Sequence, residues 1–160
     1  MKTLIIMRHA KAEASNPEGD HSRNLTARGR ADAEVAAKSM RDLGVGPNII
    51  TSSTAARALQ TADIVAAAFD HRPRESQRPD LYLAEAERLL LSIHSFDDGL
   101  DVAVLIGHNP GLLDLINLLL GPEGDRESLP TSAYAIVETE GSRWTEVAPG
   151  SVRISPIVAP

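Results

Sequence analysis

The chain has 160 residues, of which 42% are hydrophobic and 24% are charged, and its formal net charge is −6. This length predicts a single domain over residues 1–160, and the acidic balance argues against nucleic acid as a partner, because its phosphates are bound by basic surfaces. The absence of cysteine excludes disulfide bonds, thiolate metal sites and a cysteine nucleophile.

Nothing in the sequence predicts export or membrane insertion. The N-terminal apolar stretch extends only to Met7, which is too short for a signal peptide, and Arg8 follows at once. No window approaches the roughly 20 apolar residues that a membrane span needs. We therefore expect a cytoplasmic protein with no membrane partner.

The first elements in chain order are a strand and a helix. The apolar run of residues 3–7 predicts a buried strand. A polar loop rich in turn-forming residues follows, and Thr26 is then suited to be the N-cap of a helix. Met40 lies at helical spacing within that helix, and Gly44 predicts its end.

A second strand and two more helices follow. Residues 48–51 predict the strand, and the hydroxyl run Ser52–Thr54 offers N-caps for a helix that extends to about Ala68. Residues 72–80 contain two prolines and predict a loop with at most a short strand. Residues 84–95 have apolar side chains at helical spacing and predict a helix.

The clearest strand of the sequence is residues 102–106. Asn109 is the expected N-cap of the next helix, with Pro110 at its first position and residues 112–120 apolar nearly all round. Three further strands are predicted, separated by turn residues, over residues 133–138, 143–147 and 152–157. They suggest a terminal hairpin.

The alternation of strands and helices sets the fold class. It predicts a three-layer α/β/α sandwich with a largely parallel central sheet and an antiparallel edge. In such a sheet, the junctions after parallel strands lie along one edge, where ligands usually bind.

Histidines and arginines recur at three of these junctions. Arg8 and His9 follow the first strand, Arg57 lies in the first turn of the helix after the second strand, and His108 follows residues 102–106. Any one of them alone is better explained as a surface charge or a turn residue. Together, at helix N-termini whose free N–H groups favour an anion, they predict a phosphate-binding pocket.

At these positions the sequence resembles the histidine phosphatase superfamily. Met7–Ala10 is similar to its Arg-His-Gly signature, and Asn24–Arg30 to its Leu-Thr-x-x-Gly segment. Ser52–Ala62 resembles its second arginine motif, and Gly107–Pro110 its second histidine motif. The four motifs occur in the family's order and spacing, which makes the resemblance specific.

Within the superfamily, the chain resembles the SixA-type phosphohistidine phosphatases. The segments Asp20–Thr26, Asp80–Tyr82 and Pro130–Ser132 are similar to landmarks of that branch, and Ala10 replaces the commoner glycine. The resemblance implies a phosphoglycerate mutase-like fold and a cytoplasmic phosphatase that needs no cofactor and no metal.

The resemblance also implies roles for the pocket residues. His9 attacks phosphorus and forms a phosphohistidine intermediate, while Arg8, Arg57 and His108 bind the phosphoryl oxygens. Many relatives carry a carboxylate as general acid, and the candidate here is Glu85, for which a solvated position at a helix start is the competing interpretation. A missing acid suits a P–N bond, because a phosphorylated imidazole leaves as a neutral ring.

The expected partner is therefore a protein that carries phosphohistidine. A small phosphorylated molecule, hydrolysed by a phosphomonoesterase of the same superfamily, is the nearest alternative. A non-catalytic phosphoprotein-binding module is a further alternative, against which the intact His9 argues. Neither a dinucleotide-binding glycine motif nor a P-loop follows the first strand, so nucleotide-binding folds fit less well.

Overall fold

The computed structural model describes residues 1–160, with the side chain of Glu123 left aside. One six-stranded sheet runs through the molecule in the order β3-β2-β4-β1-β5-β6, so β3 and β6 are its edges. The strands are β1 (Lys2–Arg8), β2 (Ile49–Ser52), β3 (Arg74–Gln77), β4 (Val102–Gly107), β5 (Tyr134–Thr139) and β6 (Arg153–Ile154). The α-helices are α1 (Ala27–Asp42), α2 (Ala56–Ala67), α3 (Ala86–His94) and α4 (Gly111–Leu120).

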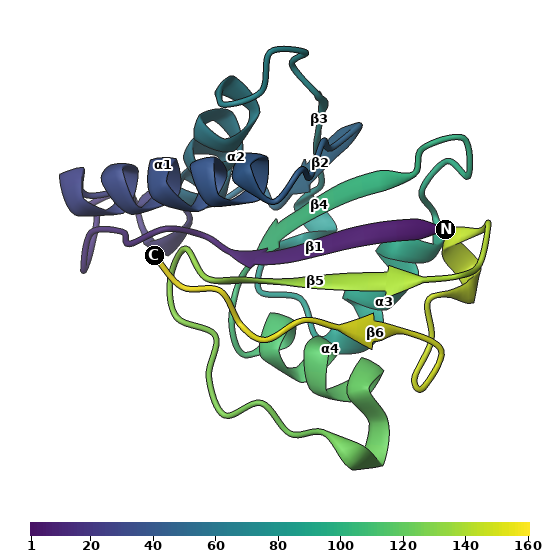
Figure 1. Cartoon of the computed structure of the whole chain (residues 1–160). Coiled ribbons are helices and arrows are strands. Elements are labelled where there is room, and N and C mark those ends of the chain that lie inside the picture. The colour runs from purple at the N-terminus through teal and green to yellow at the C-terminus, as the bar shows by residue number, and fades with distance from the viewer.

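The layers are those that the sequence predicts. Helices α1 and α2 cover one face of the sheet, and α3 and α4 cover the other (Figure 1). Strands β1 to β4 run parallel to one another, whereas β5 is antiparallel to both of its neighbours, β1 and β6. The α/β/α sandwich with a largely parallel sheet and an antiparallel edge is therefore confirmed.

The buried strand β1 divides the core into two parts. Ile5 and Met7 point toward α1 and α2, whereas Leu4 and Ile6 point toward α3 and α4. All four side chains are fully buried, as the continuous apolar run predicts for a strand covered on both faces. Because the two faces alternate along the strand, β1 positions the residues that follow it with little freedom.

Helix α1 begins where the sequence predicts and packs closely on the segment after β1. The Thr26 hydroxyl accepts a hydrogen bond from the N–H of Gly29 at 3.0 Å, which caps the helix. A Cβ atom on Gly29 would lie 2.0 Å from the carbonyl oxygen of Lys11, so only glycine fits there. Helix α1 therefore lies directly against the chain that leaves the first strand.

Several local predictions differ from the structure. Residues 143–147 form no strand, because the Arg143–Glu146 capping box closes a 3-10 turn and the Trp144 side chain is fully buried beside Phe96. Within residues 152–157, the strand is only β6, Arg153–Ile154, and a separate bridge joins Tyr134 to Val158, just beyond that range. Asn109 does not cap α4, because its amide donates to the carbonyl of Leu129.

The terminal hairpin is present in shortened form, since β5 and β6 pair antiparallel with Val137 opposite Ile154. The short strand allowed within residues 72–80 is β3. No helix within residues 1–160 is long and apolar enough to cross a membrane.

Candidate active site

Three neighbouring strands end side by side, and the predicted site residues lie at these ends. Arg8 closes β1 opposite Gly107, the last residue of β4, and Ser52 closes β2 opposite Ile106. His9 and His108 follow at the next positions of their segments. Because the strands are in register, the junctions after them share one region at the carboxyl edge of the sheet (Figure 1).

The side chains of His9, Arg57 and His108 are in contact there. Arg57 Nε lies 3.3 Å from His9 Nε2, and Arg57 Nη2 lies 3.4 Å from His108 Nδ1. The centroids of the two imidazole rings are 5.2 Å apart. All three residues are buried, with His9 7% exposed and Arg57 2%.

Backbone and side-chain hydrogen bonds orient His9 closely. Its N–H donates to the carbonyl of Gly107 at 3.1 Å, and its carbonyl accepts from the N–H of Ser132 at 3.2 Å. Its Nδ1 lies 2.7 Å from the carbonyl oxygen of Ala10, which can only accept, so Nδ1 carries the proton of the neutral ring. Nε2 therefore carries the lone pair of the neutral ring, and this lone pair accepts a hydrogen bond from Nε of Arg57.

The electrostatic surroundings keep both rings neutral. Burial lowers the pKa of His9 to about 4, and the positive charges of Arg57 and Arg8 add to that lowering. Burial also lowers the pKa of His108 to about 3, with contributions from His9 and Arg57. A neutral His9 is the form that can act as a nucleophile.

This lowered pKa predicts the pH dependence of turnover. For a nucleophilic His9, protonation would remove the lone pair of Nε2, so kcat/KM should rise with pH through about 4 and be flat between about 5 and 7. The measurement is a kcat/KM profile from pH 3.5 to 8 with an aryl phosphate, corrected for the ionisation of the substrate. An acid limb near pH 6.5, the value of an unperturbed histidine, would contradict the described environment of His9.

Arg57 presents two edges of its guanidinium to two different sets of partners. Nε and Nη2 face His9 and His108, as given above. Nη1 donates to the backbone carbonyl of Asp20 at 2.8 Å, and Nη2 donates also to the Asp20 carboxylate at 3.1 Å. The fork that matches phosphate geometry is thus the edge directed at the two histidines.

Arg8 supplies a second guanidinium. Its Nη1 donates to the carbonyl of Leu129 at 3.2 Å, and its Nε is buried without a hydrogen-bond partner among the described residues. Burial lowers the pKa of Arg8, and the charge of Arg57 contributes to this lowering, yet arginine stays protonated in proteins. Two positive charges therefore lie beside His9 in a protein that is acidic overall.

Two hydroxyl residues that we did not predict as site residues hold this arrangement. Ser53 Oγ lies 2.6 Å from His108 Nε2, and both residues are buried. Thr61 Oγ1 accepts from the N–H of Ala10 at 3.0 Å and donates to the carbonyl of Arg57 at 2.7 Å. The sequence suggested only a helix cap for the run that contains Ser53, whereas α2 has no side-chain cap.

Asp20 and Tyr82 were also missed. Asp20 lies in a 3-10 turn of the polar loop after β1, and its carboxylate accepts from Arg23 Nη1 at 2.8 Å and from the hydroxyl of Tyr82. The hydrogen bond from Tyr82, with those from Arg23 and Arg57, holds the pKa of Asp20 far below its usual range. The available signal was the resemblance of the segments Asp20–Thr26 and Asp80–Tyr82 to the SixA-type branch, from which no role for either residue was inferred.

Glu85 takes no part in this cluster. It is the N-cap residue of α3, its side chain is exposed and makes no capping hydrogen bond, and it lines a surface hollow together with Pro110 and Asp114. Among the described side chains, none of the hydrogen bonds or ion pairs joins Glu85 to Arg8, His9, Arg57 or His108.

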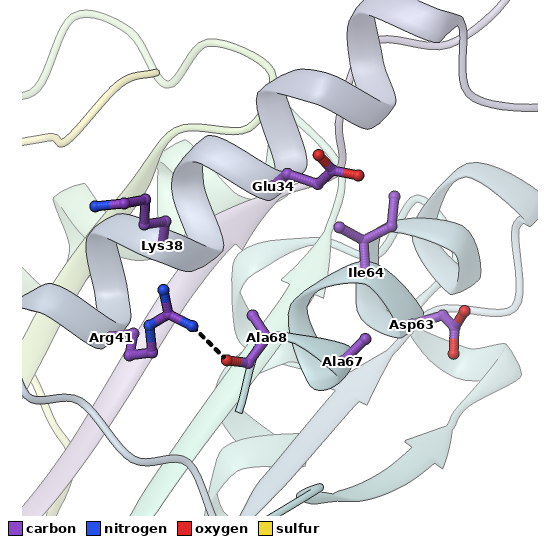
Figure 2. A pocket seen from close by; sticks show the side chains of 7 residues that line it. All are labelled: Glu34, Lys38, Arg41, Asp63, Ile64, Ala67 and Ala68. Carbon is purple, nitrogen blue, oxygen red and sulfur yellow. Dashed lines mark hydrogen bonds between the residues drawn. The ribbon is translucent and has the colours of Figure 1, made fainter. Parts of the chain in front are cut away.

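Other features of the surface do not resemble this site. A hollow of 390 Å³ between α1 and α2 has two acidic and two basic side chains in its lining, and its apolar part is Ile64, Ala67 and Ala68 (Figure 2). Arg41 there donates to the carbonyl of Ala68 at 3.3 Å. Among the described residues, there is no group of three histidine or acidic side chains that could hold a metal ion.

Comparisons with known proteins agree with this geometry. The model of the histidine phosphatase superfamily, branch 1, matches residues 4–81, a range that contains Arg8, His9 and Arg57. An uncharacterized protein of Mycobacterium tuberculosis is 30% identical over 152 residues, which cover 90% of this chain and 93% of that protein.

Solved structures match over nearly the whole chain. A candidate phosphohistidine phosphatase SixA of Agrobacterium tumefaciens is 28% identical with a TM-score of 0.81, and the match covers 99% of this chain and 98% of the other. The protein histidine phosphatase SixA, solved in complex with tungstate, is 20% identical with a TM-score of 0.84, covering 98% and 96%. At 20% identity, the match to the tungstate complex shows a shared fold.

Proposed function

Because the chain belongs to the histidine phosphatase superfamily and is a phosphatase, we propose that it hydrolyses phosphohistidine on a protein through a covalent intermediate at His9. The observation that carries this proposal is the orientation of His9. Its Nδ1 proton is directed to the carbonyl of Ala10, which leaves the Nε2 lone pair facing the guanidinium of Arg57. A neutral imidazole held in this way is a competent nucleophile.

In the proposed first step, His9 Nε2 attacks phosphorus in line with the bond to the leaving group. The His9–phosphorus bond forms as the bond to the leaving group breaks. The proton stays on Nδ1 of His9, hydrogen-bonded to the carbonyl of Ala10. Water then hydrolyses the phosphohistidine intermediate and releases inorganic phosphate.

Arg8, Arg57 and His108 stabilise the charge on the equatorial phosphoryl oxygens. The inner edge of Arg57, Nε and Nη2, offers two parallel donors, and the buried Arg8 Nε offers another. When the Ser53 hydroxyl donates to His108 Nε2, the proton of His108 resides on Nδ1, the nitrogen beside Arg57 Nη2, and can be donated to the phosphoryl group. These donors supply the positive charge, and we propose that turnover needs no metal.

The lack of a proton-donating carboxyl group among the described side chains that contact the cluster favours a P–N substrate over an ester. An alkoxide leaving group needs a proton, whereas an imidazole leaves as a neutral ring. Among the described side chains, the carboxylate that contacts the cluster is Asp20, and its lowered pKa makes it a poor proton donor. Glu85 lies outside the cluster and has no part in the proposed mechanism.

Substrate preference tests the proposal. The purified protein is incubated in EDTA with a protein phosphorylated on histidine and, separately, with a phosphoserine peptide and a sugar phosphate. The expected result is a kcat/KM for phosphohistidine at least about tenfold above that for either ester, because the ester leaving groups lack a proton donor. Faster turnover of the sugar phosphate would instead support the small-molecule phosphomonoesterase, and binding of the phosphoprotein without turnover would support the binding module.

A further inference from the structure

Asp20 places a fixed negative charge beside a pocket that binds a negatively charged group. Its carboxylate is 3.1 Å from Arg57 Nη2, and Arg57 in turn contacts His9 Nε2. A carboxylate close to a bound phosphate repels it, which weakens the binding of a simple phosphate ester. Its presence needs an explanation that the proposed phosphoryl transfer does not by itself provide.

Asp20 and a phosphoryl group can occupy Arg57 at the same time. The carboxylate and the backbone carbonyl of Asp20 bind the outer edge of the guanidinium, Nη1 and Nη2, whereas the inner edge faces His9 and His108. Arginine has five N–H donors in a fixed fork, so the two edges can serve two acceptors. Substrate binding therefore does not require Asp20 to leave.

Asp20 is also far more exposed than His9 and Arg57, so a group that leaves the cluster toward solvent can pass beside it. His9 is 7% exposed, and an in-line attack directs the leaving atom away from its ring, toward solvent. The Asp20 side chain is 46% exposed. The Tyr82 ring beside it stands edge-on to His108, at 5.5 Å between centroids, and to His21, at 4.8 Å.

The carboxylate of Asp20 has an acceptor position to spare. Oδ1 accepts from Arg23 Nη1, and Oδ2 accepts from Arg57 Nη2 and from the Tyr82 hydroxyl. A carboxylate has about four acceptor positions, so one remains on Oδ1. These same hydrogen bonds hold the pKa of Asp20 far below its usual range, so the group acts as an acceptor.

We propose that Asp20 is a specificity-determining residue that accepts a hydrogen bond from the distal N–H of a phosphorylated imidazole at the pocket mouth. This inference rests on the proposed phosphohistidine phosphatase function. The cationic, N-protonated ring of the substrate is attracted by the carboxylate that repels an ester. As His9 Nε2 bonds to phosphorus, the P–N electron pair returns to the ring nitrogen, and a neutral imidazole leaves with its distal proton still bonded to Asp20.

The test compares two leaving groups in one variant. In Asp20→Asn, the kcat/KM for phosphoimidazole divided by that for p-nitrophenyl phosphate should fall about tenfold to a hundredfold, because a charged hydrogen bond to one leaving group is lost. Asp20→Glu, which keeps a carboxylate, should lose less. Asp42→Asn removes an exposed carboxylate paired with Lys38 on α1 and serves as the matched control with an unchanged ratio.

The outcomes separate this inference from the function on which it rests. If the wild-type protein hydrolyses phosphoimidazole but Asp20→Asn lowers both rates equally, Asp20 only positions Arg57 and the inference is wrong. If the wild-type protein does not hydrolyse phosphoimidazole at all, the proposed function itself is wrong.

A measurement on the wild-type protein avoids any dependence on the folding of the variant. The compound 1-methyl-3-phosphoimidazolium keeps the positive ring but has no distal N–H. Relative to its uncatalysed hydrolysis, its enzymatic turnover should be about tenfold or more below that of phosphoimidazole. Equal acceleration of the two compounds would overturn the hydrogen bond to Asp20.

Discussion

His9→Gln is expected to abolish the covalent intermediate and to lower turnover by roughly 10⁴–10⁶-fold, the scale on which removal of a nucleophile acts. Glutamine keeps a polar side chain of similar reach but has no lone pair that can attack phosphorus. The measurement is a rapid acid-free quench with a radiolabelled phosphoimidazole donor, followed by peptide mapping of the acid-labile, alkali-stable phosphate. The label should appear on His9 in the wild-type protein and be absent from the variant.

A matched control separates this effect from general damage to the protein. His71 is exposed and lies beyond the end of α2, so His71→Gln should retain both turnover and labelling. Thermal unfolding of the two variants should be compared, because His9 is buried and its loss changes packing. Labelling that persists at His108 in the His9→Gln protein would mean that the other ring is the nucleophile.

Arg57→Lys is expected to lower kcat/KM about 10²–10³-fold, because a preorganised donor to the phosphoryl oxygens is lost although the positive charge is kept. The guanidinium contacts His9, His108 and Asp20 with three different nitrogens, and an ammonium group cannot reproduce this fork. The loss should fall mainly on kcat if the contacts strengthen in the transition state. Steady-state kinetics with p-nitrophenyl phosphate measure it.

The control for Arg57 is an arginine with a single backbone partner. Arg41 on α1 donates to the carbonyl of Ala68 at the hollow between α1 and α2, and Arg41→Lys should keep kcat/KM within about twofold (Figure 2). An Arg57→Lys protein with the wild-type rate would remove Arg57 from the proposed mechanism and leave it a purely structural role.

The parts of the fold that the sequence predicts are those with a strong local pattern. Residues 3–7 and 102–106 are short apolar runs, and both are buried strands in the centre of the sheet. Thr26 caps α1 because its hydroxyl accepts from the nearby N–H of Gly29 in the first turn of the helix, which is a local interaction. Histidine and arginine recur after three strands, and the parallel sheet alone then predicts that these residues lie close together.

The predictions that are wrong concern residues whose partners lie far away in the chain. Asn109 could cap a helix, but the carbonyl of Leu129 takes its amide instead. Ser53 could cap α2, but His108, 55 positions later, lies 2.6 Å from its hydroxyl. Residues 143–147 are predicted as a strand, but the buried Trp144 ring packs against Phe96 and its indole N–H donates to the carbonyls of Asp97 and Leu100. Asp20 belongs to the same class, because Arg57 and Tyr82 give it a role that its loop does not reveal.

The two edges of the sheet bear on how a phosphoprotein can be recognised. Edge strands offer unpaired backbone groups to which an extended peptide can add as a further strand. Here β3 is four polar residues with Arg74 and Glu75 exposed, and β6 has two residues, followed closely by Pro156. A strand added at β3 would have to desolvate charged side chains. A strand added at β6 could form only a few backbone hydrogen bonds, because β6 has two residues. Recognition by strand addition is thereby disfavoured. Under the proposed function, the phosphorylated side chain itself would be the main point of attachment, and one phosphatase could act on proteins of unrelated backbone sequence.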